Sequence, residues 1–226
     1  LMDTETTIPL FPLGVVLLPA MVLPLHIFEE RYKIMIGECL EQNREFGIVY
    51  SDQEEIRKRG CTAKIVEVLG RYDDGRMDIL TRGVKRFLIE DIFDEKPYLQ
   101  ARVAYFDDAV EEKTEELAAL VNDGIKLLQE LDIWTGKRTD YNSVLELDPK
   151  IISFLLAYND EFTPGEKQKF LAMTSTRQRL IESADALRKI VERFKKELVI
   201  KKIVAGNGNL GKRTAARPAD NIYETE

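Results

Sequence analysis

The sequence is poor in the side chains that most often build catalytic and metal sites. Its 226 residues include one histidine, His26, and two cysteines, Cys39 and Cys61. Metal sites that need two imidazoles are therefore excluded, although a site of carboxylates or cysteines stays open. Because the cysteines have neither the paired spacing of a zinc site nor the number of a disulfide framework, we expect no metal and no cofactor.

A long apolar run and a basic amino terminus are also missing. No stretch approaches the roughly 18 consecutive apolar residues of a membrane helix. Acidic Asp3 and Glu5 precede the first apolar run, where a secretory signal would carry basic residues. The net charge of −7 and the pI near 5.1 argue against a dedicated nucleic-acid-binding protein. We expect a cytoplasmic protein that makes no membrane contact.

Catalytic constellations are not evident. Any Ser-His or Cys-His catalysis would have to use His26 itself. That histidine lies in apolar surroundings, which favours a structural role with a bond to a backbone group. Acidic pairs such as Asp73/Asp74 and Asp107/Asp108 are adjacent in sequence, and turn chemistry explains them without a catalytic role. The sequence therefore indicates a protein that is not an enzyme.

What the sequence does have is an apolar stretch at residues 8–32 that four prolines interrupt. Because proline has no amide hydrogen and biases the residue before it towards extended backbone, neither a regular helix nor a long central strand can run through this stretch. We expect short extended pieces, bent at the prolines, that wrap around a small barrel or sheet and close it. Helical spacing begins at about Phe28, and Gly37 within that helix indicates a close backbone contact.

Strand-forming residues follow. Asp74-Gly75 is the pair that a tight hairpin favours, and it lies between two β-prone runs. Gly83 is expected to make a bulge at a junction between strands. We expect a mostly antiparallel, closed or nearly closed sheet. The expected strands cover residues 61–69, 77–81, 84–93 and 98–106.

Beyond residue 106 the alternation gives way to helical spacing. The last helix is expected to run from Thr176 to Ala205, with Gly206 as its stop. Apolar residues near its end exceed what a solvated helix end requires, which favours a homo-oligomer formed through this helix. The chain would then divide into a β-rich subdomain (residues 1–108), a helical subdomain (109–205) and a polar tail (206–226). The apolar residues in question are Val199, Ile200, Ile203 and Val204.

Four segments carry a family resemblance. PLFPLGVVLLP followed by LPLHIFEERY resembles the opening of the amino-terminal domain of Lon protease. IVEV at residues 65–68, DGRMDILTRGVKRF at 74–87 and KPYLQARV at 96–103 are similar to that family in order and spacing. Glu30 is a departure, because the family usually has proline there.

The resemblance implies an α+β fold, in which a PUA-like antiparallel pseudo-barrel precedes a helical bundle with one long carboxyl-terminal helix. It also implies a non-catalytic module that binds unfolded or tagged polypeptides, as this domain does in Lon. Too few residues follow for the ATPase and the Ser-Lys peptidase of Lon, so the resemblance implies a stand-alone module.

Two sets of residues are candidate binding sites, and a third interpretation stays open. Apolar residues of the proline-rich stretch could hold a polypeptide, although the same residues could equally fill the core. Cations of the 81–87 segment could instead hold RNA or a nucleotide, or simply form a solvated edge. The third interpretation, an enzyme with an unrecognised pocket, is supported only by His26 and by scattered carboxylates. The apolar set is Phe11, Leu13, Leu18, Met21 and Leu25, and the cationic set is Arg82, Lys85 and Arg86.

The carboxyl-terminal tail contains part of one further motif. Residues 206–212 fit the first seven positions of a phosphate-binding loop, G-x-x-x-x-G-K. Arg213 stands where that motif needs a Ser or Thr for Mg²⁺, and Pro218 ends any following helix early. We therefore predict no Mg-ATP binding in calorimetry. Micromolar affinity that disappears in Lys212→Ala would contradict this prediction.

Overall fold

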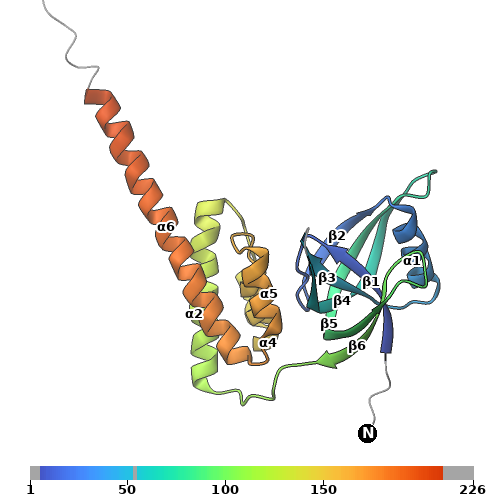
Figure 1. Cartoon of the computed structure of the whole chain (residues 1–226). Coiled ribbons are helices and arrows are strands. Elements are labelled where there is room, and N and C mark those ends of the chain that lie inside the picture. The colour runs from blue at the N-terminus through green and yellow to red at the C-terminus, as the bar shows by residue number, and fades with distance from the viewer. Residues whose placement is uncertain (1–5, 53–54, 211–226) are drawn as a thin grey trace, which may run out of the picture.

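The computed structural model describes residues 6–52 and 55–210, with side chains as far as Ile200. A β-rich part and a helical part stand side by side, and the segment after β6 joins them (Figure 1). The strands are β1 Thr6–Leu13, β2 Val22–Ile27, β3 Phe46–Ser51, β4 Ile56–Arg71, β5 Met77–Phe93 and β6 Gln100–Phe106. The helices are α1 Glu30–Glu41, α2 Glu115–Thr135, α3 Tyr141–Leu145, α4 Pro149–Ala157, α5 Pro164–Ala172 and α6 Thr176–Leu210.

The strands form one sheet, and five of them close into a ring. Their order is β2-β5-β4-β3-β1-β6, and β6 pairs with β5 as well, which closes a ring of five strands. Only β1 and β3 are parallel among the described pairs, so the expected antiparallel, closed sheet followed by helices is confirmed. β2 lies outside this ring and pairs with β5 alone, and residues 64–71 of β4 also pair with β5 alone.

β1 shows how prolines enter a closed sheet. Thr6 to Pro9 pair with β6, whereas Leu10 to Leu13 pair with β3. Each half therefore has a partner on one side only, and the missing amide hydrogens of Pro9 and Pro12 leave no gap in a two-sided ladder. As the sequence predicted, no long central strand with partners on both sides runs through this stretch.

β5 is one strand of 17 residues, where the sequence predicted two strands with a junction between them. Its first half pairs with β2 as far as Arg82, and its second half pairs with β6 from Arg86 onward. The proline-rich segment crosses β5 between these two partners. Gly83 donates to the Met21 carbonyl oxygen and accepts from the Ala20 amide, each at 2.9 Å. The segment thus closes the barrel, as expected.

Gly83 is needed for this crossing. A Cβ atom at this position would lie 2.2 Å from the carbonyl oxygen of Leu18, closer than any real contact. Backbone-to-backbone approach is one of the situations in which only glycine fits. The register of β4 against β5 also shifts here, between Cys61 and Ala63, so the expected irregularity at Gly83 is present.

Three details of the predicted helices are wrong. α1 begins at Glu30 rather than Phe28, and a Cβ atom on Gly37 would meet nothing within 4 Å, so no close backbone contact explains that glycine. α6 continues through Gly206 to Leu210. A glycine weakens a helix by about 1 kcal/mol but does not end it by itself. None of the described helices combines the length and the apolar character needed to cross a bilayer.

α2 and α6 run parallel, because their exposed ion pairs follow the same direction along both helices. These pairs are Arg177–Glu116, Arg188–Asp123 and Lys195–Glu130. α6 then extends beyond the end of α2 (Figure 1). There Val199 and Ile200 are exposed, whereas the side chains of Ile203 and Val204 lie outside the described residues.

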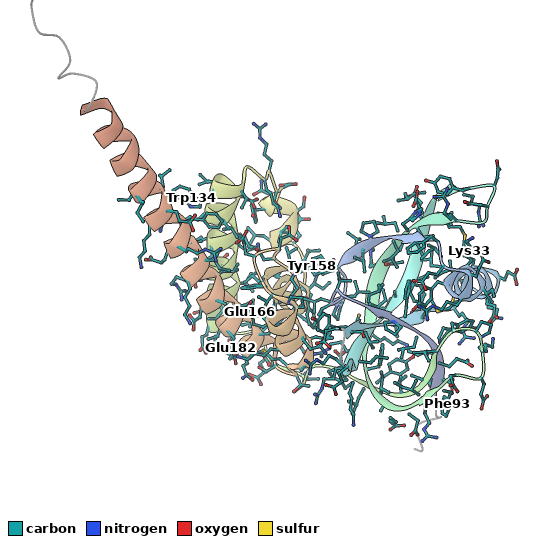
Figure 2. The ribbon with its side chains drawn as sticks, turned by 45° about the horizontal axis from the view of Figure 1, so that its top comes forward. Lys33, Phe93, Trp134, Tyr158, Glu166 and Glu182 are labelled. Carbon is teal, nitrogen blue, oxygen red and sulfur yellow. The ribbon has the colours of Figure 1, made fainter. Side chains whose placement is uncertain are left out.

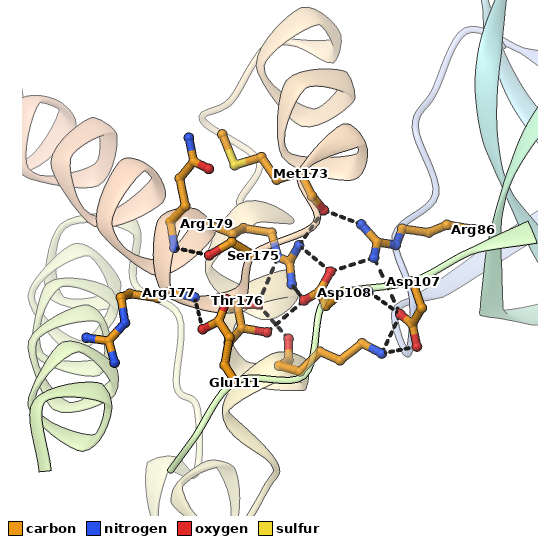
Figure 3. A network of polar contacts seen from close by, with 12 residues as sticks. Arg86, Asp107, Asp108, Glu111, Met173, Ser175, Thr176, Arg177 and Arg179 are labelled. Atoms are coloured by element: carbon orange, nitrogen blue, oxygen red, sulfur yellow. Dashed lines mark hydrogen bonds and ion pairs between the residues drawn. The ribbon is translucent and has the colours of Figure 1, made fainter. Parts of the chain in front are cut away.

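A buried charged network joins the two parts (Figure 3). Asp108, in the segment between β6 and α2, receives hydrogen bonds from Arg86 of β5 at 2.5 Å and from Thr176 of α6 at 2.7 Å. It also accepts from Arg179 of α6. The side chains of Arg86, Asp108 and Arg179 are only 1%, 4% and 0% exposed.

The two guanidinium groups find further partners. Arg86 donates to the Leu171 carbonyl oxygen at 3.0 Å, and Arg179 donates to Ser153 of α4 at 2.9 Å. Both donate to the Met173 carbonyl oxygen. Since buried charges are tolerated only when paired and hydrogen-bonded, this satisfied set fixes how strand β5 sits against helices α4 and α6.

Gly83→Ala should destabilise the protein by about 3 kcal/mol, because the new methyl group meets backbone that cannot turn aside. Chemical denaturation measures this change. Gly37→Ala is the matched control, since its methyl group meets nothing and alanine favours a helix. It should raise the free energy of unfolding by up to about 1 kcal/mol. Equal effects of the two substitutions would contradict the crossing described here.

Asp108→Asn should cost about 3–5 kcal/mol of stability, because two buried guanidinium groups lose their shared counter-charge. Burial raises the pKa of the Asp108 carboxyl, but hydrogen bonds from Arg179 and Thr176 outweigh burial and hold this pKa below its usual value. The stabilisation is therefore complete at neutral pH and is lost in acid, below about pH 4.

The control for this prediction is Asp123→Asn, which removes an ion pair of half-exposed side chains. Such pairs contribute at most about 1 kcal/mol. Denaturation at pH 7 and at pH 3 compares both variants with the parent protein. A loss for Asp108→Asn no larger than that of the control would show that the buried network contributes little.

Candidate functional site

The apolar residues expected to bind polypeptide lie mostly in the core. Phe11, Leu18 and Met21 are buried, and the Phe11 ring lies 3.9 Å from the ring of Tyr32 between centroids. Leu13 and Leu25 are half-buried and pack against the same core. These side chains therefore fill the space between barrel, α1 and helices, and do not form an exposed apolar surface.

The expected cationic set does not come together on the surface either. Arg86 points inward to Asp108, as described above, and only Arg82 and Lys85 are exposed. The Lys85 ammonium lies over the Tyr105 ring, 5.2 Å from its centroid. A hollow of about 330 Å³ opens beside them between barrel and helices, and Lys150 there is already paired with Asp107.

His26 is bonded to a side chain, not to a backbone group as the sequence predicted. Its side chain is 44% exposed, and its Nδ1 atom lies 2.6 Å from a carboxylate oxygen of Asp78. Tyr72 donates to the other oxygen at 2.6 Å. These two hydrogen bonds, that of Tyr72 foremost, hold the pKa of Asp78 below its ordinary value. The alternation of β2 turns His26 to the outside of the barrel, because Leu25 and Ile27 point inward.

Both cysteines are unsuited to nucleophilic chemistry. Cys39 and Cys61 are buried free thiols. Burial raises the pKa of Cys39 to about 11 and that of Cys61 to about 12, so neither forms a thiolate at neutral pH. Within the described ranges, no group of three or more His, Cys, Asp or Glu side chains could hold a metal ion.

An exposed apolar surface does exist, on the outer side of β2, β5 and β4. The side chains of Val22, Pro24 and His26 point outward from β2, and register places them opposite Arg82, Leu80 and Asp78 of β5. We name the apolar part of this surface the hairpin face, since it spans the β4–β5 hairpin. It consists of the exposed residues Val22, Pro24, Phe28, Val66, Leu69 and Tyr72 and of the half-buried Leu80.

Two bulges create much of the hairpin face. The register of β4 against β5 shifts between Ile65 and Glu67 and again between Val68 and Gly70. The extra residues at these shifts are Val66, which is 43% exposed, and Leu69, which is 55% exposed. A bulge places an additional side chain on one side of the strand, which breaks the two-residue alternation.

The hairpin face runs from the helical part to the hairpin tip. At its helical end the Tyr158 hydroxyl donates to the Val22 carbonyl oxygen at 3.0 Å, and Figure 2 shows Tyr158 at the border between the two parts. At the tip Lys33 of α1 donates to the Asp74 carbonyl oxygen at 2.8 Å and so ties the turn to the barrel. Contiguous exposed apolar side chains of this kind mark surfaces that bind partners.

Known proteins resemble this chain over most of its length. The Lon protease of Flavobacterium johnsoniae is 25% identical over 195 residues, which are 80% of this chain and 24% of that protein. The Lon protease of Parabacteroides distasonis is 29% identical over 126 residues, 51% of this chain and 15% of that protein. The chain thus spans a quarter or less of the length of these relatives.

Solved structures share its fold. A Lon N-terminal domain protein from Xanthomonas campestris superposes with a TM-score of 0.62 at 22% identity, covering 78% of this chain and 96% of that one. The N-terminal domain of the Mycobacterium avium complex Lon protease gives 0.64 at 23% identity, covering 81% and 98%. The sequence profile of the ATP-dependent protease La (LON) substrate-binding domain matches residues 7–189. The chain therefore belongs to the LON substrate-binding domain family.

Proposed function

We propose that this chain binds polypeptide segments through the hairpin face and does not act on them chemically. The observation that carries the proposal is the contiguous exposed apolar surface over three strands, within the region that matches a substrate-binding domain. Full burial of one such side chain by a partner is worth about 1.5–3 kcal/mol, so several contacts are needed to offset the cost of association. Unfolded polypeptides expose the apolar side chains that this surface requires.

Side chains, rather than added backbone hydrogen bonds, would provide the affinity. An extended peptide can join a sheet at an open edge, and β2 has such an edge. Pro24 in the middle of β2 has no amide hydrogen to donate, which discourages pairing along this edge. The partner would therefore lie across the face, against Val66, Leu69 and Leu80.

Absence of catalysis belongs to the same proposal. The thiols have raised pKa values, and the one histidine is held by Asp78. The segment 206–212, which partly fits a phosphate-binding loop, begins inside α6 and not after a strand; its last two residues lie outside the described residues. RNA or nucleotide binding through Arg82, Lys85 and Arg86 is less favoured, because Arg86 is enclosed.

A double substitution on the hairpin face tests the proposal. Val66→Ser with Leu69→Ser should weaken binding of an unfolded, fluorescently labelled polypeptide by about tenfold or more, since two exposed apolar contacts are lost. Binding to the parent protein should change little between 50 and 300 mM salt and should show a negative heat-capacity change. Anisotropy and calorimetry measure these quantities.

Leu145→Ser is the matched control, because Leu145 is similarly exposed, at 46%, but lies on α3 in the helical part. It should leave the affinity unchanged. Equal losses for the control and the double variant would contradict a site on the hairpin face. Steeply salt-dependent RNA binding that Arg82→Ala abolishes would favour the polyanion alternative instead.

A further inference from the structure

Two cations stand together at the helical end of the hairpin face. Lys64 of β4 and Arg82 of β5 are directly opposite each other in the sheet, and both side chains are exposed. Val22 of β2 flanks Arg82 on the other side. Throughout the described part of the chain, neither cation has a hydrogen-bonding or ion-pair partner.

This arrangement is unfavourable for the free protein. Like charges directly opposite each other on a sheet destabilise it. The chain carries 40 acidic and 33 basic residues, so carboxylates are available as partners. Other exposed arginines use them, since Arg76 pairs with Asp74 at 2.7 Å and Arg193 with Glu161 at 2.6 Å. Lys64 and Arg82 are thus placed as a pair of donors without an acceptor.

The opposite end of the hairpin face is negative. Asp78 holds a lowered pKa through its hydrogen bonds from Tyr72 and His26, so it is ionised at neutral pH. Leu80 lies between Asp78 and Arg82 on the same side of β5, two residues from each. In a strand that spacing is roughly 7 Å. The apolar surface is therefore polarised, with cations beside the helical part and a carboxylate near the tip.

We infer that Lys64 and Arg82 bind a carboxylate of the polypeptide, so that the hairpin face selects apolar segments with an acidic residue beside them. This inference rests on the proposed function. An extended peptide whose apolar side chains cover Leu80 and Val66 brings a residue one or two positions away over the cation pair. Arg82 provides a planar donor group suited to a carboxylate, and Lys64 adds a second charge.

A peptide carboxylate fits this site better than a nucleic-acid backbone. Phosphate backbones are bound by rows of cations that neutralise several charges along the strand. Here two cations are followed by apolar side chains and then by the ionised Asp78, which would repel a continuing polyanion. Glu67 of β4, opposite Leu80, adds to that repulsion.

The test uses two labelled decapeptides that differ only in charge. Each has the apolar centre Leu-Val-Phe-Leu, flanked on both sides by Glu in one peptide and by Gln in the other. We expect the Glu peptide to bind the full chain about fivefold more tightly in 50 mM salt, and this ratio should shrink in 300 mM salt. Lys64→Gln with Arg82→Gln should abolish the ratio while leaving the affinity for the Gln peptide unchanged.

Control variants separate this inference from the function on which it rests. Lys58→Gln changes another exposed cation of β4 and should keep the fivefold ratio. Equal affinity of the parent protein for both peptides, with both weakened by Leu69→Ser, would overturn the inference and leave the proposed function intact. Binding of neither peptide would overturn both. A single-stranded oligonucleotide that binds more tightly than the Glu peptide and depends on Arg82 would overturn the inference in favour of RNA.

Discussion

The arrangement of this protein depends on one carboxylate shared by two buried guanidinium groups. Asp108 follows the last strand of the barrel, Arg86 comes from its longest strand and Arg179 from its longest helix, so three distant segments meet at one point. Removing charges from water is costly, and only complete pairing offsets the cost. The hairpin face begins on the barrel and ends against Tyr158 of the helical part, so its extent depends on the orientation that this network fixes.

Local patterns predicted much of the architecture. The Asp74-Gly75 turn and the change from alternating to helical spacing after residue 106 are features of short segments, and both are present. The predictions failed where distant segments decide the outcome. The sequence predicted a break between two strands at Gly83, yet Gly83 lies within β5. The glycine is needed there because a segment some 60 residues earlier in the sequence crosses β5 at this point.

The candidate site was less predictable than the fold, for a related reason. Composition shows that the proline-rich stretch is apolar, but it does not show which of its apolar residues face the core. Phe11, Leu18 and Met21 face the core. Leu69 is exposed because a bulge shifts the alternation of β4, and the position of this bulge follows from the pairing of β4 with β5. Arg86 and Arg82 look alike in the sequence, although one is enclosed by carbonyl oxygens and Asp108 and the other is open to solvent.

Pro24 is relevant to aggregation, a problem common to proteins that expose apolar surfaces. A module with an open strand edge next to exposed apolar side chains has the features that lead identical copies to stack into fibres. β2 lies outside the ring of five strands and carries a residue that cannot continue a hydrogen-bond ladder. Pro24 therefore disfavours strand pairing between copies of this chain along β2, beside the exposed apolar side chains of the hairpin face.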